Sequence, residues 1–168
     1  MNIREARPEE FAAVRALMVA GYAEYAAWAG DEIWREWSAE IADVESRLND
    51  SRLLVAEEDG TLLGAVTYYP PGTGGGYDES WPRAWAGFRL LAVAPAARGR
   101  GAGRRLVDAC IDAARADGAQ SLSLGTTEIM KTARAMYERM GFVRAPEYDF
   151  SPVPGVLVYA YVMSLEES

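Results

Sequence analysis

The chain has 168 residues, half of them hydrophobic, and a formal net charge of −8. This length fits one domain, and this share of apolar residues is enough for a sizeable core. The acidic balance argues against nucleic acid as the main partner and is compatible with a cationic substrate. No apolar run approaches the roughly 20 residues of a membrane-spanning helix. We therefore expect a single domain over residues 1–168 that binds neither nucleic acid nor membrane.

The chain contains no histidine and a single cysteine, Cys110. Ser-His-Asp and Cys-His catalysis and His-ligated metal sites are thereby excluded, and we expect no metal. Proton transfer must use carboxylates, tyrosine or water. Cys110 falls on the apolar face of an expected helix, which predicts a core residue rather than a nucleophile. One cysteine and an N-terminus without an apolar signal region predict a cytoplasmic protein.

The N-terminal part is expected to hold one strand followed by aromatic helices. Residues 2–6 suit a short strand, and residues 8–10 suit the first turn of a helix. Gly30-Asp31 is expected to divide the helical region in two before it ends near residues 49–50. Its aromatic side chains are either ordinary core or the wall of a substrate cleft; they are Tyr22, Tyr25, Trp28, Trp34 and Trp37.

Two strands and a long loop are expected next. Residues 52–57 and 61–69 are rich in β-branched, aromatic or leucine side chains, and residues 58–60, Glu-Asp-Gly, predict a hairpin turn between them. Residues 70–85 form a loop that, at this length, is either mobile or functional. A lid over a cleft and simple surface packing are both open for its large side chains, which are Tyr77, Trp81 and Trp85.

A strand, a glycine-rich turn and a helix follow one another over residues 88–117. The apolar run 88–94 suits a buried strand, and Gly118 suits the end of the helix. Backbone N–H groups and the dipole at a helix start favour phosphate, which glycines let approach the backbone closely. The stretch thus predicts a turn that binds a pyrophosphate. The alternative is a glycine-rich connection between strand and helix that binds no ligand. Four arginines add positive charge: Arg98, Arg100, Arg104 and Arg105.

Three phosphate-binding patterns compete for this turn. A P-loop requires lysine followed by serine or threonine, which the turn lacks, and a dinucleotide fingerprint requires glycine where Arg104 stands. The third pattern, Arg/Gln-x-x-Gly-x-Gly/Ala, is matched by Arg98, Gly101 and Gly103. Together with residues 91–95, Leu-Ala-Val-Ala-Pro, the stretch resembles the acetyl-CoA-binding motif of the GNAT family of N-acetyltransferases.

Strands and one helix are expected to alternate from the central motif to the end of the chain. We expect a strand at 121–124, a helix that ends at Gly141 with a strand starting directly after it, a turn at 151–155 and a strand at 156–165. The segment from this helix into the next strand, Ala133-x-x-Met136-Tyr137-x-x-x-Gly141-Phe142, is also similar to GNAT sequence. The specific resemblance therefore covers residues 88–142.

The resemblance implies an α/β (α+β) fold with a mixed, mainly antiparallel central sheet, a splayed parallel strand pair and flanking helices. It implies acetyl-CoA as cosubstrate, with strand backbone groups for the pantetheine arm and the turn for the pyrophosphate. The cofactor-binding residues implied are Leu91, Ala92, Val93, Arg98, Gly99, Arg100, Gly101, Ala102, Gly103, Arg104 and Tyr137.

The resemblance also implies a place for Tyr137 near the thioester sulfur, where it would protonate the leaving thiolate; a core tyrosine is the alternative. Two positions depart from the family. Met130 stands where asparagine is frequent, and the strand before the motif lacks the glutamate that many members carry. The general base is therefore open among an ordered water and four carboxylates: Glu128, which we place with Tyr137 as the catalytic pair, Glu24, Asp78 and Glu79.

The function implied is acetyl transfer from acetyl-CoA to a primary amine of a small molecule or peptide, by direct attack in a ternary complex. A non-catalytic acyl-CoA-binding sensor is the alternative from another class, and O-acetyl or succinyl transfer would keep the fold and change the substrate. A homodimer is also kept open. The aromatic helices and the 70–85 loop would form the binding site for the acetyl acceptor. Their residues match no sequence pattern that would identify this acceptor.

Overall fold

The computed structural model describes residues 1–76 and 80–166, which divide into two compact units. Strand β4 (Trp85–Val93) and helix α5 (Ala102–Ala116) each contribute residues to both units. The expected single domain over residues 1–168 stays a prediction. The first unit comprises Met1–Tyr68 and Leu90–Ala109, and the second Tyr69–Arg89 and Cys110–Ser168.

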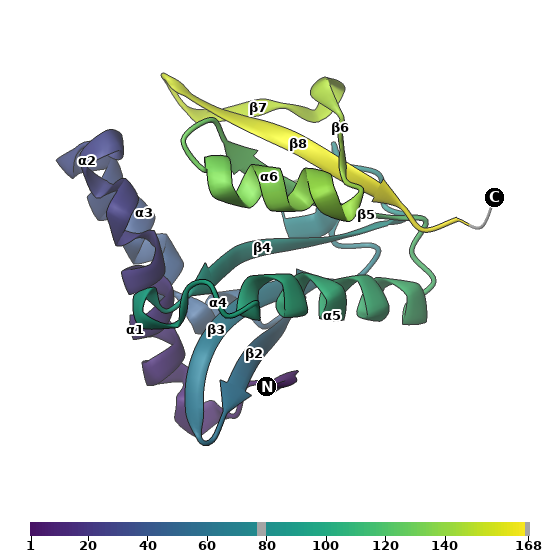
Figure 1. Ribbon diagram of the computed structural model, residues 1–168. Coiled ribbons are helices and arrows are strands. Elements are labelled where there is room, and N and C mark those ends of the chain that lie inside the picture. Colours follow the sequence, from purple (N-terminus) through teal and green to yellow (C-terminus); the bar gives the residue numbers. More distant parts are fainter. Residues whose placement is uncertain (77–79, 167–168) are drawn as a thin grey trace. The chain divides into compact units, whose positions relative to one another are not determined.

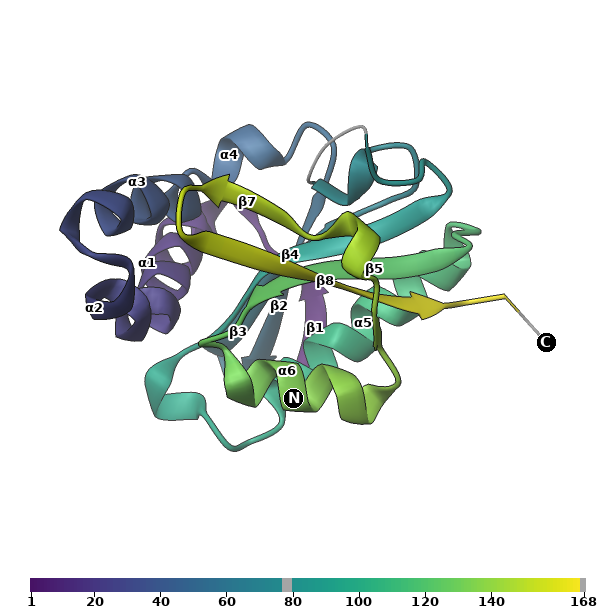
Figure 2. The ribbon, with the colours of Figure 1, turned by 90° about the horizontal axis from the view of Figure 1, so that it is seen from above.

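The first unit pairs antiparallel strands with a group of helices. Strand β1 pairs with β2, β2 pairs with β3, and α1 and α3 lie side by side in Figures 1 and 2. The expected N-terminal strand and hairpin strands are confirmed. The elements are β1 (Asn2–Glu5), α1 (Phe11–Tyr22), α2 (Ala26–Ala29), α3 (Asp31–Ala42), α4 (Val44–Arg47), β2 (Arg52–Glu58) and β3 (Thr61–Tyr69).

Local backbone demands explain the turns of this unit. Gly30, with φ of 87°, separates α2 from α3 as expected, and a further break at Asp43 starts α4. Asp59 and Gly60 both have positive φ, 52° and 81°, as a two-residue type I′ hairpin requires. Between helices and strands lies a core of side chains less than one-tenth exposed: Val14, Met18, Ile41, Val44, Leu53, Val55, Ala65, Leu90 and Ala92.

The second unit is built around the long strand β8, which pairs antiparallel with β5, β6 and β7. Figure 2 shows β7 and β8 running alongside each other as a hairpin. Helix α6 ends at Gly141, whose φ of 105° confirms the expected cap. The elements are β5 (Ser121–Thr127), α6 (Lys131–Met140), β6 (Val143–Arg144), β7 (Phe150–Val153) and β8 (Val156–Ser164).

The prediction of a turn over residues 151–155 is wrong, because the turn in the structure is shorter. Ser151 to Val153 belong to β7, and only Pro154 and Gly155 connect it to β8. Pro152 is tolerated in β7 because a proline, which cannot donate to a ladder, is acceptable in an edge strand or at an irregularity. The register with β8 shifts between Phe150 and Val153, which supplies that irregularity.

The 70–85 loop packs against its own unit over the residues that the structure describes. Trp81 is 2% exposed and its ring lies 5.7 Å from that of Tyr148 and 6.3 Å from that of Trp85. The N–H of Gly72 donates to the carbonyl of Arg83 and closes the loop at its base. Packing therefore accounts for both tryptophans: Trp81 is part of a small buried cluster, and Trp85, which begins β4, packs against it. Tyr77 lies outside the described residues.

At one point the 70–85 loop contacts β4 directly through backbone atoms, where two glycines face each other. A Cβ on Gly87 of β4 would lie 2.7 Å from the Cα of Gly75, closer than real Cβ contacts allow. The hydroxyl of Ser123 closes the same site and donates to the carbonyl of Ala86 at 3.1 Å. Parallel pairing of β4 with β5 covers Trp85–Gly87 and Ser121–Ser123, so this contact braces the pair where it is hydrogen-bonded.

We expect Gly87→Ala to destabilise the protein. The new methyl group has backbone on its far side, and overpacking of this kind costs about 1–3 kcal/mol. At about 2–4 °C for each kcal/mol in a chain of this size, the midpoint should fall by several degrees. Thermal unfolding followed by circular dichroism measures the shift. An unchanged midpoint would mean that the loop moves away from β4 at little cost.

The strands form a mixed, mainly antiparallel sheet with β4 and β5 as the parallel pair, and helices flank it, which confirms the expected fold class. Cys110 is fully buried in α5, as its place on the apolar face predicts. Along residues 1–76 and 80–166, no helix is both long and apolar enough to cross a bilayer.

Candidate active site

Strand β4 changes its backbone direction at Leu90. This residue has φ of 58°, a left-handed conformation that is a clear outlier for a leucine, although its side chain is 9% exposed and packed in the core. Strained residues inside strands re-aim the backbone and are concentrated at functional sites. The residues that follow, Leu91 to Val93, are those expected to offer backbone groups to a cosubstrate.

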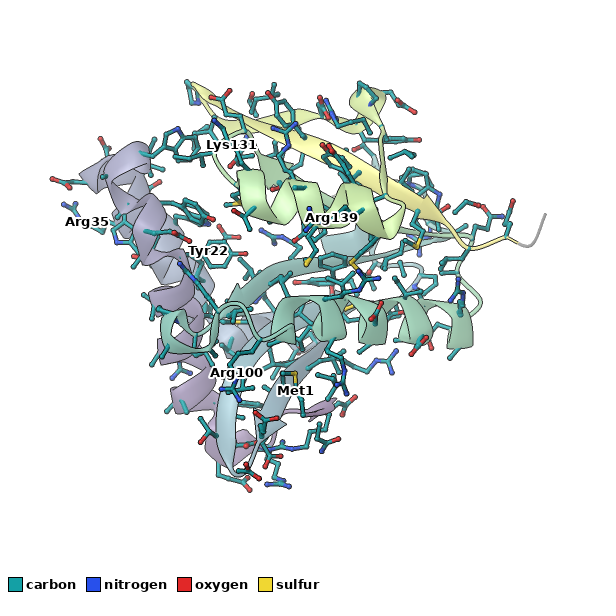
Figure 3. The ribbon with its side chains drawn as sticks, in the orientation of Figure 1. Met1, Tyr22, Arg35, Arg100, Lys131 and Arg139 are labelled. Atoms are coloured by element: carbon teal, nitrogen blue, oxygen red, sulfur yellow. The ribbon has the colours of Figure 1, made fainter. Side chains whose placement is uncertain are left out.

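The backbone of Leu91–Val93 is held from two sides in the first unit. The hydroxyl of Tyr22 donates to the carbonyl of Leu91 at 2.9 Å, and a Cβ on Gly64 of β3 would lie 2.8 Å from the carbonyl of Ala92. Tyr22, on α1, is labelled in Figure 3. The carbonyl of Leu91 therefore has a partner within the chain, so a ligand that uses it must share it with Tyr22.

The glycine-rich turn has the backbone geometry of an anion site. Gly99 and Gly101 have φ of 81° and 85°, both are exposed, and a Cβ at either would meet no atom within 4 Å. The N–H of Arg105 donates to the carbonyl of Gly101, so Gly101 is the N-cap of α5. The N–H groups of the next three residues, Ala102 to Arg104, thus have no partner inside the helix. A 15-residue helix adds its dipole, and the turn fits a pyrophosphate.

Carboxylates already contact two of the arginines around this turn. Arg98 forms an ion pair with Glu24, with Nη2 and Oε1 3.0 Å apart, and Arg100 pairs with Glu58. Glu58 also lies 3.5 Å from the terminal amine of Met1, which Figure 3 shows close to Arg100. Sequence analysis missed these pairs because the partners are 74 and 42 residues apart. Arg104 is exposed and forms no ion pair with the other described residues.

We expect Glu24→Gln to tighten the binding of CoA. The side chains of Arg98 and Glu24 are 44% and 47% exposed, and such pairs contribute about 0.2–1 kcal/mol, so removing the competing carboxylate should lower the Kd roughly 1.5- to 5-fold. Calorimetric titration with CoA measures this. Glu45→Gln, which breaks the exposed pair with Arg15 and changes the net charge equally, is the control and should leave the Kd unchanged. Weaker binding in Glu24→Gln would mean that Glu24 positions Arg98 instead of competing for it.

The aromatic side chains of the N-terminal helices form one cluster. The ring of Trp37 lies 5.5 Å from that of Tyr22, 6.3 Å from that of Tyr25 and 5.7 Å from that of Trp34. Tyr22, Trp34 and Trp37 also pack against the core of the first unit, and Trp28 is 36% exposed. Packing thus accounts for three of these five side chains. Their role as the wall of a substrate cleft stays a prediction.

Tyr25 connects this cluster to the turn within the first unit. Burial raises the pKa of Tyr25, the charge and hydrogen bond of Glu24 raise it further, and Arg98 opposes them. The phenol therefore stays protonated at neutral pH and donates to a carboxylate that is itself paired with an arginine of the turn. Glu24, one of the candidate bases, is thus engaged by two side chains.

Tyr137 lies on α6 in the second unit and is 5% exposed. Its ring packs edge-on against those of Phe88 and Phe142, at 5.9 Å from each. This is the environment that a core tyrosine would have, and the role of Tyr137 as general acid stays a prediction. Met130, where the family often has asparagine, caps the start of α6, and its sulfur accepts from the hydroxyl of Thr126 at 3.5 Å.

The other candidate bases are placed as follows. Glu128 is exposed in the turn directly after β5, at the end of that strand as expected. Asp78 and Glu79 lie outside the described residues. The residue before Glu128, Thr127, is buried. Over residues 1–76 and 80–166, no group of three or more Cys, Asp or Glu side chains is arranged to hold a metal ion.

Comparisons with known proteins agree with this geometry. Residues 11–142 match the model of the acetyltransferase (GNAT) family. An uncharacterized N-acetyltransferase of Bacillus subtilis (strain 168), YhfO, is 35% identical over 144 residues, which are 84% of this chain and 89% of that protein. The IAA acetyltransferase of Azospirillum brasilense is 37% identical over 106 residues, 62% of this chain and 63% of that protein.

A solved structure extends the likeness to the fold. The GNAT family acetyltransferase of Brucella melitensis in complex with acetyl-CoA is 25% identical and superposes with a TM-score of 0.65, over 99% of this chain and 88% of that one. The family match spans most of this chain and includes the strand, turn and helix described above. The chain therefore belongs to the GNAT family and is an acetyltransferase.

Proposed function

We propose that the chain transfers the acetyl group of acetyl-CoA to a primary amine of a small molecule or peptide, by direct attack in a ternary complex. The observation that carries this proposal is the start of α5, where two exposed, left-handed glycines precede three N–H groups without a helical partner. This is a site for a pyrophosphate. A single cysteine fits a reducing compartment, and we propose the cytoplasm.

Each cosubstrate-binding residue has a defined part in this proposal. Gly99 to Arg104 would hold the pyrophosphate through backbone N–H groups, and Arg98 and Arg100 would balance its charge once it displaces their carboxylates. Leu91 to Val93 would offer backbone groups to the amide-bearing arm. Acetyl-CoA, when bound, supplies an activated acetyl thioester, so the protein has only to position the amine and manage protons.

Proton transfer would fall to residues of the second unit. Tyr137 would hold a proton at its hydroxyl and give it to the thiolate that leaves as the new C–N bond forms. Glu128, or a water that it orients, would take the proton that the amine loses. A covalent acetyl-enzyme is not part of the proposal, because Cys110 is fully buried and the chain has no histidine to activate a hydroxyl.

The family assignment supports turnover. A non-catalytic acyl-CoA sensor is the alternative from another class, and the packing of Tyr137 is the one observation that is compatible with it. A phenol enclosed by Phe88 and Phe142 serves the core even where no proton is transferred. Both candidates require acetyl-CoA binding at the turn, and they differ in turnover. O-acetyl and succinyl transfer remain variants of the catalytic proposal that change the acceptor or the donor.

The deciding experiment is a thiol-release assay with acetyl-CoA over a panel of amines, amino acids and short peptides, with alcohols and succinyl-CoA as further arms. We expect amine-dependent release of CoA that persists in EDTA. Calorimetry with acetyl-CoA runs in parallel. Binding without release for any acceptor would support the sensor, and absence of binding by the folded protein would overturn both candidates.

A further inference from the structure

Two arginine side chains lie over one tyrosine ring in the second unit. The guanidinium carbon of Arg134, on α6, is 4.8 Å from the centroid of the Tyr159 ring, and that of Arg144, on β6, is 4.6 Å from it. All three residues are half-buried, and Tyr159 belongs to β8. A ring under a guanidinium attracts its charge and restrains its position. Two positive charges thus share one ring, and partial burial favours a counter-charge for each.

Arg144 has its counter-charge in Asp149. Nη1 and Nη2 of Arg144 donate to the two carboxylate oxygens of Asp149 at 2.8 and 2.7 Å, which is the bidentate arrangement typical of this pair of groups. The hydrogen bond from Arg144 holds the pKa of Asp149 below its usual value, so the carboxylate stays charged at neutral pH. An arginine over Tyr159 can therefore still hold a carboxylate at the edge formed by Nη1 and Nη2.

Arg134 lies over the same ring without a carboxylate. Its Nε donates to the hydroxyl of Tyr161 at 3.3 Å, while Nη1 and Nη2 have neither a hydrogen bond nor an ion pair within residues 1–76 and 80–166. Glu138, four residues further along α6, donates no counter-charge directly, because it accepts from the hydroxyl of Tyr161 at 2.8 Å. A basic residue four positions before an acidic one is the less favourable order on a helix. The Nη1–Nη2 edge of Arg134 is therefore open.

We propose that the guanidinium of Arg134 binds the carboxylate of a small organic acid. A guanidinium offers a rigid planar fork that matches the two oxygens of a carboxylate. The contact with Tyr159 and the hydrogen bond to Tyr161 already orient this fork, so binding has little side-chain freedom left to remove. The site lies within the second unit and is independent of the proposed acetyl transfer.

The carboxylate has two sources to be distinguished. It belongs either to the acetyl acceptor, as in an amino acid, or to a separate acid that binds beside the reaction. The contact with Arg134 is the same in both cases, because a guanidinium recognises the carboxylate and not the rest of the molecule. Binding is therefore tested with a simple acid, and the source with a pair of acceptors.

The test titrates the protein with benzoate and with benzamide, its uncharged counterpart, followed by ¹H–¹⁵N NMR. Wild type is expected to bind benzoate, with the largest shifts around Arg134, and not to bind benzamide. Arg134→Gln should weaken benzoate binding about tenfold or more, because hydrogen bonds between charged groups are lost. Arg134→Lys keeps the charge but not the fork, and should recover only part of the affinity.

Arg139 provides a matched control. It lies on α6, where Figure 3 labels it, and is exposed. Neither an aromatic ring nor a carboxylate of the described part of the chain contacts its guanidinium. Arg139→Gln changes the net charge as Arg134→Gln does and should leave the Kd for benzoate unchanged. Melting temperatures of both variants show that they are folded.

The source of the carboxylate is tested by thiol release with alanine and alaninamide as acceptors. If the acceptor carries the carboxylate, Arg134→Gln should raise KM for alanine, leave KM for alaninamide unchanged and keep kcat for both. An unchanged KM for both acceptors assigns the carboxylate to a separate acid.

Three results would overturn the inference. The first is no binding of benzoate by wild type, or equal binding by wild type and folded Arg134→Gln. The second is binding of benzoate only in Glu138→Gln, which would mean that Glu138 fills the fork in solution. The third is a loss of CoA affinity in Arg134→Gln that exceeds the loss for benzoate, which would assign Arg134 to a phosphate. A protein that transfers no acetyl group would leave the inference standing, because the benzoate titration requires no turnover.

Discussion

Replacing Gly101 by valine is expected to weaken acetyl-CoA binding well over tenfold while the protein stays folded. Gly101 has φ of 85°, a conformation that a β-branched residue adopts only with strain of order 1–3 kcal/mol. A side chain would also occupy the open space next to the N-cap of α5, where a phosphate must approach the backbone. Calorimetric titration with acetyl-CoA and thermal unfolding measure the two effects separately.

Gly155 provides a matched control for the strain. Its φ is 84°, a Cβ there would also meet no atom within 4 Å, and it lies in the turn between β7 and β8. Gly155→Val should therefore lower the melting temperature about as much as Gly101→Val and leave the Kd for acetyl-CoA unchanged. Folded Gly101→Val with wild-type affinity would show that the turn does not hold the pyrophosphate.

Removing the hydroxyl of Tyr137 is expected to lower kcat about 10- to 100-fold and to leave cosubstrate affinity nearly intact. General acids contribute about 10²–10⁴-fold, and a thiolate is already a fair leaving group, so the lower end applies. A group that acts only in the transition state changes turnover without changing ground-state binding. Turnover and the Kd for acetyl-CoA are to be measured on Tyr137→Phe, with the chemical step shown to be rate-limiting.

Tyr161 is the control for a purely structural tyrosine. It is 1% exposed, its hydroxyl donates to Glu138 at 2.8 Å and accepts from Arg134 at 3.3 Å, and both partners lie on α6 with Tyr137. Tyr161→Phe should lose about 1 kcal/mol of stability and keep its turnover. Turnover of Tyr137→Phe within about threefold of wild type would leave Tyr137 as a core residue and favour a solvent proton donor.

The sequence determined those parts of the site that depend on local backbone chemistry. The start of α5 directly after the glycine-rich turn and the cap at Gly141 were predicted from the positions of the glycines, and both agree with the structure. The structure adds that Gly99 and Gly101 have positive φ, which glycine tolerates. The hairpin at Asp59-Gly60 follows from the same rule. Strand β5 was predicted too short and β7 was predicted as part of a turn, because the extent of both depends on pairing with β8 and not on their own residues.

The tertiary structure decided which groups meet. Glu24 and Glu58 contact the arginines of the turn across 74 and 42 residues of chain, and no local pattern links a carboxylate to a guanidinium at that separation. The left-handed Leu90 is equally hidden, since a leucine by itself avoids positive φ and only its packed neighbours hold it there. Whether a side chain such as that of Arg134 finds a partner is settled only when all helices and strands are in place, because burial and hydrogen bonding are properties of the assembled structure.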